Sequence, residues 1–200
     1  FRMDALKSGA VYDRYANDFA WLIDAAVVLP TYQVSEPKRP LRRTAQENKF
    51  KLYEADTGLL LSQYAPQTML DVIADAPSVN FGSVYENAVA QALSNENPDL
   101  FYFCSSRKGE VDFIAQRNDG ALVPIEVKSG KDYKLHTALN NLLGTHDFEI
   151  GEACVLSSAN VERREREGKP IWYLPLYMAF CIAEQTSGTF GSMHLAPPTF

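Results

Sequence analysis

Two short segments near the middle of the chain place charged side chains inside otherwise apolar stretches. Residues 109–114 contain Asp112, and residues 123–130 contain Glu126 and Lys128. Because successive side chains of a β-strand point to opposite faces, Glu126 and Lys128 share one face of a strand. An unpaired carboxylate among apolar neighbours is costly to bury, so a cation is expected beside it. The pattern predicts a charged site built on two neighbouring strands.

The residues between these strands predict a tight hairpin. Residues 117–121 have the Asn, Asp and Gly composition of a turn. A three-residue loop over 118–120 sets Asp112 opposite Glu126 and keeps one face of the hairpin apolar. A two-residue loop would set Asp112 opposite Val127 and mix the faces, so the three-residue loop is favoured. The same register pairs Phe113 with Ile125, Ala115 with Val123, Val111 with Val127 and Glu110 with Lys128.

Two facing carboxylates on neighbouring strands indicate a divalent metal. Directly opposite residues have Cβ atoms about 4.5–5.5 Å apart, where like charges destabilise a sheet. Mg²⁺ or Mn²⁺ between Asp112 and Glu126 would remove that repulsion, with waters and phosphate oxygens as the other ligands. Lys128 can hold the attacking water and offset negative charge that develops on phosphorus. The constellation therefore predicts metal-assisted hydrolysis of a phosphodiester.

Asp112 followed by Glu126-X-Lys128 resembles the Asp…Glu-X-Lys core of the restriction-endonuclease-like nucleases, the PD-(D/E)XK superfamily. The resemblance implies that Asp112 and Glu126 hold the metal and that Lys128 assists the water. It also implies that Glu86, at the matching position of a preceding helix, is a further catalytic and metal-binding residue. Val111 stands where the superfamily's name has Pro. The fold implied is a restriction-endonuclease-like mixed central sheet flanked by helices.

A narrower resemblance depends on the order of several segments. Residues 50–60, the helix with Glu86 and the two strands are similar, in that order, to the uncharacterised domain at the C-terminal end of many prokaryotic AAA-type ATPases. By this resemblance, residues 49–184 are the nuclease-like domain and residues 1–48 a small winged-helix-like segment with a linker. Residues 185–200 are expected to form a loose tail. The expected partner is an N-terminal ATPase region of the same, longer polypeptide.

The charged residues also have a purely structural interpretation. Ser83 precedes Glu86 by three residues, which is the spacing of a capping box at the start of a helix. The charged strand residues can equally form a solvated polar face, on which Glu110 and Lys128 make a weak ion pair. Both alternatives stay open at the level of the sequence.

The overall charge separates two functional hypotheses. A net charge of −6 and a pI of about 5.1 argue against a protein that holds nucleic acid by bulk electrostatics, since phosphate contacts need Lys and Arg. Local basic clusters exist at Lys38, Arg39, Arg42 and Arg43, at Lys128, Lys131 and Lys134, and at Arg163, Arg164 and Arg166. The intact Asp-Glu-Lys set favours a metal-dependent nuclease acting on DNA or RNA. The acidic charge favours an inactive nuclease-fold module that recognises nucleic acid or protein, or assembles the attached ATPase.

Composition and missing motifs limit the other possibilities. With 46% hydrophobic residues, 200 residues can bury one sizeable core. No apolar run approaches the roughly 20 residues that cross a bilayer, so no membrane partner is expected. Three cysteines without paired spacing indicate reduced thiols in the cytoplasm. Gly130-Lys131 and Gly168-Lys169 lack the upstream Gly and the following Ser or Thr of a P-loop, so no ATPase site is expected in this chain.

The apolar periodicity predicts mixed helices and strands, and thus an α/β protein with a central mixed sheet. Helices are expected over 12–26, from Thr57, over 83–95, over 135–143 and from Pro175. Strands are expected over 27–34, 50–54, 100–104, 110–116, 122–128, 153–156 and 171–173. Residues 65–78 show no clear period.

Overall fold

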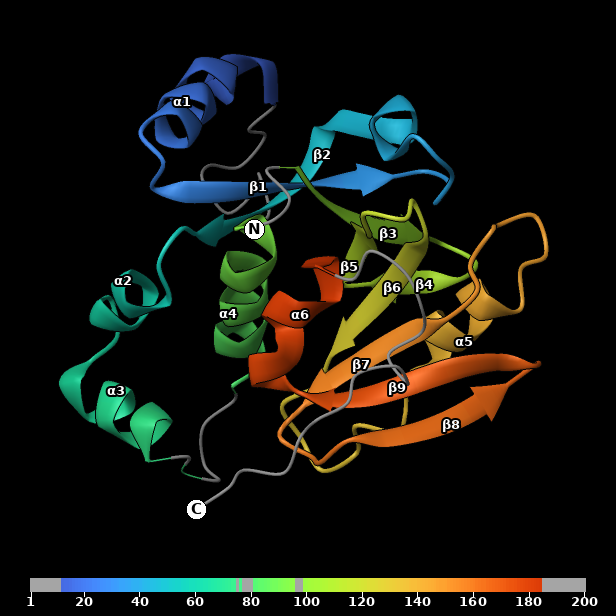
Figure 1. Cartoon of the computed structure of the whole chain (residues 1–200). Coiled ribbons are helices and arrows are strands. Elements are labelled where there is room, and N and C mark those ends of the chain that lie inside the picture. The colour runs from blue at the N-terminus through green and yellow to red at the C-terminus, as the bar shows by residue number, and fades with distance from the viewer. Residues whose placement is uncertain (1–11, 75, 77–80, 96–98, 185–200) are drawn as a thin grey trace.

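The computed structural model describes residues 12–74, 76, 81–95 and 99–184 and shows an α/β fold (Figure 1). Helices flank two mixed sheets, which confirms the predicted fold class. The predicted tail lies outside the described residues. Among the described helices, none has both the length and the apolar character to cross a membrane.

The first sheet has the strand order β2-β1-β3-β4. Its strands are β1 (Val28–Val34), β2 (Ala45–Glu54), β3 (Leu100–Ser105) and β4 (Gly109–Val111). Strand β1 pairs antiparallel with β2 and parallel with β3, and β3 pairs antiparallel with β4. Helix α1 (Tyr12–Asp24) lies next to β1 at the upper end of Figure 1. This sheet therefore joins residues from both the predicted winged-helix-like segment and the predicted nuclease-like domain.

The second sheet has the strand order β5-β6-β7-β9-β8. Its strands are β5 (Phe113–Gln116), β6 (Leu122–Val127), β7 (Ala153–Ser157), β8 (Glu162–Arg166) and β9 (Lys169–Pro175). The outer pairs β5–β6 and β8–β9 are antiparallel, whereas β6, β7 and β9 run parallel. Strand β6 is buried along its whole length, as expected of a strand covered on both faces.

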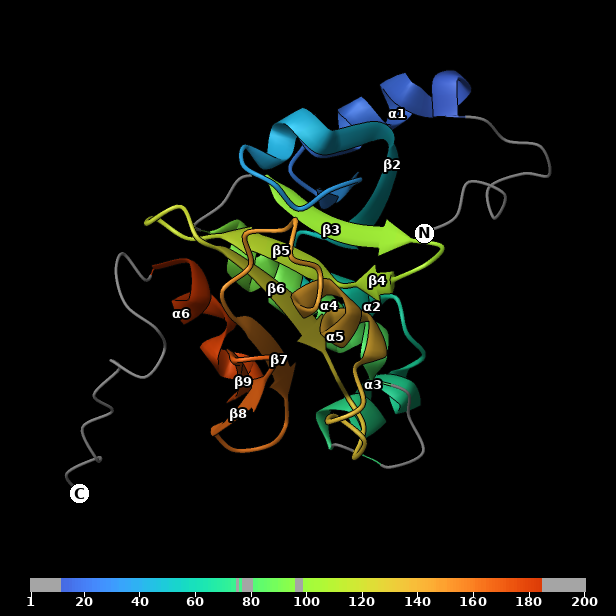
Figure 2. The same ribbon diagram turned by 90° about the vertical axis from the view of Figure 1, so that its right-hand side faces the viewer.

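Helices cover both faces of the second sheet. The described helices after α1 are α2 (Thr57–Ser62), α3 (Pro66–Ile73), α4 (Gly82–Ser94), α5 (Thr137–Leu143) and α6 (Ala179–Glu184), with short 3-10 turns at Leu41–Thr44 and Leu176–Met178. Of these, α4 and α6 pack on one face of the second sheet and α5 on the other, whereas α2 packs against α4 and β2. Alternate residues of β7 contact opposite sides: Cys154 and Leu156 pack in the cluster of α4 and α6, and Val155 packs in the cluster of α5. Figure 2 shows α5 and α6 on different sides of these strands.

The hairpin between β5 and β6 has the predicted register. Phe113 pairs with Ile125, and the Arg117 N–H donates to the Ala121 carbonyl at 3.0 Å. Gly120 closes the three-residue loop with a φ of 85°, a conformation that glycine adopts without strain. The three-residue loop is therefore confirmed.

The predicted strand over 110–116 is wrong in one respect, because it breaks at Asp112. Val111 pairs with Phe103 in the first sheet, and Phe113 begins the ladder of the second. The chain thus passes from one sheet to the other at Asp112. The predicted pairs of Val111 with Val127 and of Glu110 with Lys128 are not formed, since β4 pairs with β3 instead.

Other elements differ from the predictions in extent. Strand β2 begins earlier than residue 50 and runs through the predicted boundary between residues 48 and 49. Helix α3 lies in the stretch without a clear period. Strand β8 was not predicted because its five residues are all charged; they form an exposed edge, where charge protects a sheet from further pairing.

Candidate functional site

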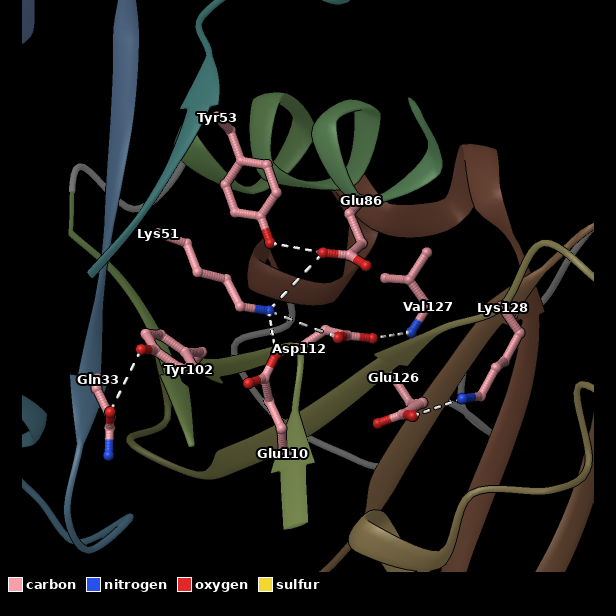
Figure 3. A network of polar contacts seen from close by, with 10 residues as sticks. All are labelled: Gln33, Lys51, Tyr53, Glu86, Tyr102, Glu110, Asp112, Glu126, Val127 and Lys128. Carbon is pink, nitrogen blue, oxygen red and sulfur yellow. Dashed lines mark hydrogen bonds and ion pairs between the residues drawn. The ribbon is translucent and has the colours of Figure 1, made fainter. Parts of the chain in front are cut away.

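The four predicted site residues come from three places that converge where the two sheets meet (Figure 3). Asp112 lies at the junction of β4 and β5, Glu126 in β6, and Lys128 just after β6. Glu86 projects from the second turn of α4 toward the same region. The negative charges of Glu126 and Glu86 both act on Asp112, so the three carboxylates form one electrostatic group.

Asp112 is held by a backbone hydrogen bond. Its Oδ2 accepts from the Val127 N–H at 2.8 Å, and its side chain is 14% exposed. An uninterrupted hairpin would have brought the carbonyl of Val111 to this N–H. Because the chain leaves the second sheet at Asp112, the carboxylate serves as the acceptor instead. The strand break thus fixes one Asp112 oxygen and leaves Oδ1 without a hydrogen bond from this backbone group.

Glu126 is the most deeply buried acid of the group. Its side chain is 8% exposed, and Oε1 accepts from Lys128 Nζ at 2.7 Å. The other oxygen, Oε2, has no hydrogen-bond partner among the described residues. In Figure 3 this oxygen points away from Lys128, on the side where Glu110 and Asp112 lie. A buried carboxylate oxygen without a donor is the kind of atom that a metal ion or its water can satisfy.

Burial and mutual repulsion raise the proton affinity of both strand acids. Burial, followed by the charges of Glu126 and Glu86, raises the pKa of Asp112 to about 7. Burial also raises the pKa of Glu126, although the hydrogen bond from Lys128 acts in the opposite direction. The site therefore has more negative charge than its own cations neutralise, which favours binding of a further cation.

Glu86 faces the site and does not cap its helix. Helix α4 begins after Phe81, with no side-chain hydrogen bond at its N-cap, so the capping-box interpretation is wrong. Glu86 Oε2 instead accepts from the Tyr53 hydroxyl at 2.9 Å. Burial and the nearby Glu86 charge raise the pKa of Tyr53 far above its ordinary value, which keeps the phenol protonated as a donor.

Lys51 of β2 is a site residue that the sequence interpretation missed. Its Nζ lies 2.6 Å from Glu110 Oε1 and 3.8 Å from both Asp112 Oδ1 and Glu86 Oε2. Burial opposes the charge on Lys51, but the hydrogen bond to Glu110 and the other carboxylates outweigh it and raise the Lys51 pKa. The alternation of β2 holds a signal for this, since Lys51 and Tyr53 share one face of the strand.

Glu110 therefore has a different partner from the predicted one. Its ion pair is with Lys51 and not with Lys128, which pairs with Glu126. The interpretation of the charged residues as an open solvated face is also wrong in part, because Asp112 and Glu126 are mostly buried.

The arrangement fits a cation held by two carboxylates. Within the described residues, no group of three or more His, Cys, Asp or Glu side chains is arranged to hold a metal ion. Among the described residues, Glu126 Oε2 has no hydrogen-bond partner and Asp112 Oδ1 lies 3.8 Å from Lys51 Nζ, whereas Glu86 Oε2 accepts from Tyr53. Mg²⁺ commonly takes one or two protein carboxylates and keeps several waters. These residues therefore suit Mg²⁺ or Mn²⁺ with mostly water and substrate ligands.

A cavity of about 630 Å³ lies beside this group and is lined by Lys51, Tyr53 and Glu86 among others. A second cavity of about 390 Å³, between Arg42, Leu93 and Arg117, contains none of the predicted site residues. Of the predicted site residues, only Glu86 lines the first cavity; Asp112, Glu126 and Lys128 are not among its lining residues.

The predicted basic clusters are partly neutralised by carboxylates. Arg39 pairs with Glu149 at 2.9 Å, and Arg42 with Asp99. On β8, Arg164 pairs with Glu162 at 2.6 Å. These cations are solvent-exposed and accounted for by neighbouring acids, so their presence alone does not define a nucleic-acid surface.

Comparison with protein families gives a match to part of the chain. Neither curated proteins nor solved structures match the chain. A family model matches one segment of the chain. This segment contains Glu86, Asp112, Glu126 and Lys128, and it begins after Lys51 and Tyr53. Residues 81–177 of this chain are similar to the family described as a domain of unknown function, DUF4143.

Proposed function

We propose that the chain is a metal-dependent nuclease domain, related to the PD-(D/E)XK nucleases, that hydrolyses phosphodiester bonds of DNA or RNA. The main support is the buried pair of Asp112 and Glu126, whose excess negative charge and unpartnered Glu126 oxygen favour a divalent cation. The proposal includes an attached AAA-type ATPase region in the same polypeptide, as the order of the segments suggests.

Each side chain has a distinct role in this proposal. Asp112, fixed by the Val127 N–H, and Glu126 hold Mg²⁺ or Mn²⁺. The ion, when bound, lowers the pKa of a coordinated water and offsets charge on the phosphate. Lys128 is held by Glu126 at 2.7 Å, and its ammonium orients the attacking water beside the carboxylates. Glu86 accepts a hydrogen bond from Tyr53 and orients waters in the outer part of the site.

A second candidate is an inactive module that recognises nucleic acid or protein, or assembles the ATPase. Two observations favour it: the net charge of −6, and the ion pairs that neutralise several exposed arginines. Phosphate contacts need available Lys and Arg, so this balance is unfavourable for tight nucleic-acid binding. The two candidates differ in whether the carboxylates bind a metal that supports cleavage.

Calorimetry with Mn²⁺ tests the metal site. We expect the wild type to bind Mn²⁺, and we expect Asp112→Ala to lose binding because one of two protein ligands is gone. Asp147→Ala is the matched control, since Asp147 is an exposed acid far from the site in sequence. Absence of metal-dependent heat in the wild type would overturn the proposed function.

Nicking of supercoiled plasmid separates the two candidates. In the proposed enzyme, Lys128→Ala abolishes Mn²⁺-dependent nicking at a temperature where circular dichroism shows the variant to be folded. Its melting temperature is expected to fall, because the buried Glu126 loses its ion-pair partner. Lys38→Ala, which removes an exposed lysine paired with Glu36, is expected to nick like the wild type. A wild type that binds Mn²⁺ but cuts neither DNA nor RNA would favour the inactive module.

A further inference from the structure

Lys51 places a permanent positive charge next to the acid that we propose as a metal ligand. Its side chain is 18% exposed, so little water screens it. Nζ is 3.8 Å from Asp112 Oδ1, the Asp112 oxygen that the Val127 N–H leaves available. Figure 3 shows the ammonium at the centre of Glu86, Glu110 and Asp112. In the metal-free protein, Lys51 is the cation that neutralises this side of the site.

A divalent ion and this ammonium compete for the same oxygen. Mg²⁺ binds carboxylate oxygens at about 2.0–2.1 Å, so an ion on Asp112 Oδ1 would lie close to Nζ. Two cations at that separation repel each other strongly where water is scarce. The affinity of the site for a metal therefore depends on where the ammonium is held.

Glu110 holds the ammonium away from Asp112. The 2.6 Å contact to Glu110 is much shorter than the 3.8 Å contact to Asp112, and the Glu110 side chain is 45% exposed at the rim. The ring of Tyr102 lies 5.1 Å from Nζ and offers a cation–π contact on the same side. The Tyr102 hydroxyl donates to Gln33 Oε1 at 3.3 Å, which orients the ring. These groups give Lys51 a place that does not require Asp112.

We propose that Lys51 and Glu110 form a tuning pair: Lys51 is the internal counter-cation that competes with the metal, and Glu110 sets how strongly it competes. This inference rests on the proposed function, since it takes Asp112 and Glu126 as the metal-binding acids. It assigns a specific role to two residues outside the Asp-Glu-Lys set.

The proposal predicts opposite changes in Mn²⁺ affinity when Lys51 and Glu110 are substituted. Lys51→Met removes the competing charge and keeps the length of the side chain, so Mn²⁺ binds on the order of tenfold more tightly. Glu110→Gln frees the ammonium to move onto Asp112, so Mn²⁺ binds on the order of tenfold more weakly. In the Lys51→Met background, Glu110→Gln changes the Mn²⁺ affinity much less, because the Lys51 ammonium that Glu110 binds is absent.

The experiment is Mn²⁺ calorimetry on the full chain at one neutral pH, with the wild type, the two single variants and the double variant. Lys49→Met is the matched control, since Lys49 lies on the same strand two residues away but is exposed. It is expected to leave the Mn²⁺ affinity within about twofold of the wild type, because exposed charges are well screened.

A second measurement, of the melting temperature, tests the inference even if Lys51→Met is less stable than the wild type. In EDTA, Lys51→Met is expected to melt at a lower temperature than the wild type, since the carboxylates lose their counter-cation. Added Mn²⁺ is expected to raise the melting temperature of Lys51→Met more than that of the wild type, because a ligand stabilises the folded state more when it binds more tightly.

The outcomes distinguish this inference from the proposed function. If Mn²⁺ binds and Asp112→Ala abolishes binding, but Lys51→Met binds Mn²⁺ no more tightly than the wild type, the inference is wrong and the proposed function stands. If the wild type and Lys51→Met both bind Mn²⁺, and Lys51→Met binds it about tenfold more tightly, the inference and the proposed function are both supported. If no variant binds Mn²⁺, both are overturned.

Discussion

The protonation of Asp112 affects both the charge of the site and the stability of the fold. Its carboxylate is mostly buried, and Glu126 and Glu86 add negative charge around it. These effects raise its pKa to about 7 from an ordinary 3.8, although the Val127 N–H acts in the opposite direction. Near neutral pH, the metal-free protein therefore exchanges a proton at the position that we assign to a metal.

The raised pKa of Asp112 predicts a pH-dependent stability. Between about pH 4 and pH 7 the folded protein keeps a proton that the unfolded chain has released, so the free energy of unfolding falls as the pH rises. The slope from this one group is at most about 1.4 kcal/mol per pH unit. Urea unfolding in EDTA at several pH values measures it. Asp112→Asn is expected to flatten the slope.

Asp147→Asn provides the comparison for that experiment, because this exposed acid makes the same chemical change outside the site. The assignment would be contradicted if Asp112→Asn kept the wild-type slope, or if Asp147→Asn removed it equally. Saturating Mn²⁺ is expected to recover, near pH 7 and above, the stability that the wild type loses between about pH 4 and pH 7, because the metal binds the deprotonated site.

The sequence predicts the site residues that lie close together along the chain, and it misses Lys51, which is distant from them in sequence. Asp112, Glu126 and Lys128 follow from strand alternation and a turn between them. Glu86 came from the family resemblance alone. Lys51 lies on a strand whose place beside Asp112 depends on the pairing of β1 with β3, across a long sequence separation. No local period encodes such a contact.

At the scale of elements, the hairpin was predictable and the strand break was not. The loop at 118–120 has a composition that specifies its length, and the register followed from keeping one face apolar. The break at Asp112 arises because Val111 and Phe113 each suit a buried strand, but in different sheets. Apolar alternation continues through the break, so the sequence pattern alone cannot distinguish one strand from two.

Asn87 ties α4, which bears Glu86, to the end of β2. It is 2% exposed; its Oδ1 accepts from the Glu54 N–H at 2.8 Å, and its Nδ2 donates to the Glu54 carbonyl at 3.1 Å. Asn87→Leu is expected to lower the free energy of unfolding by about 2–4 kcal/mol, because buried backbone groups lose their partners. Urea unfolding checks this value. Asn95→Leu, at the exposed end of α4, is expected to change it by less than about 1 kcal/mol.

A buried ion pair joins the hairpin loop to the centre of the second sheet. The Arg117 guanidinium contacts Glu152, and Trp172 Nε1 donates to the same carboxylate at 3.1 Å. Glu152→Ala removes one of the two carboxylates that pair with the buried Arg117, so that only Asp119 remains, and it leaves Trp172 Nε1 without its acceptor. We therefore expect a loss of about 1–3 kcal/mol in the free energy of unfolding.

The matched control for that prediction is Glu149→Ala. Glu149 also pairs with an arginine, Arg39, but its side chain is 76% exposed. Exposed pairs contribute about 0–1 kcal/mol, so this variant is expected to unfold almost like the wild type. Equal losses in the two variants would show that burial of the Arg117 pair is not what makes it important.

At the scale of the whole molecule, the site lies where the two sheets meet, in a chain whose overall charge is acidic. The first sheet supplies Lys51 and Glu110, and the second supplies Glu126. A nucleic acid approaching this region meets a chain of net charge −6. In the proposed function, nucleic-acid binding would therefore depend on a few cations near the site and on the metal, and not on a broad basic surface.

This charge balance predicts a shallow salt dependence for nucleic-acid binding. We expect the logarithm of the affinity to fall with the logarithm of the salt concentration with a slope of about −2 to −3, the value for two or three phosphate contacts. Lys131 is exposed just beyond β6 and forms no ion pair within the described residues, so we expect it to be one of these contacts. Fluorescence anisotropy of a labelled duplex, in the Lys128→Ala background with Mn²⁺, measures the slope without cleavage.

Removal of Lys131 tests which cations contribute. Lys131→Ala is expected to reduce the slope by about one unit, because each phosphate contact releases one counterion. Arg164→Ala is expected to leave the slope unchanged, since Glu162 already neutralises this guanidinium at 2.6 Å. Two results would contradict this prediction: a wild-type slope of about −6 or steeper, or an equal change of the slope in Lys131→Ala and Arg164→Ala. Either result would mean that the ion pairs of β8 open to bind phosphate, and that the net charge of the chain does not indicate how this surface binds nucleic acid.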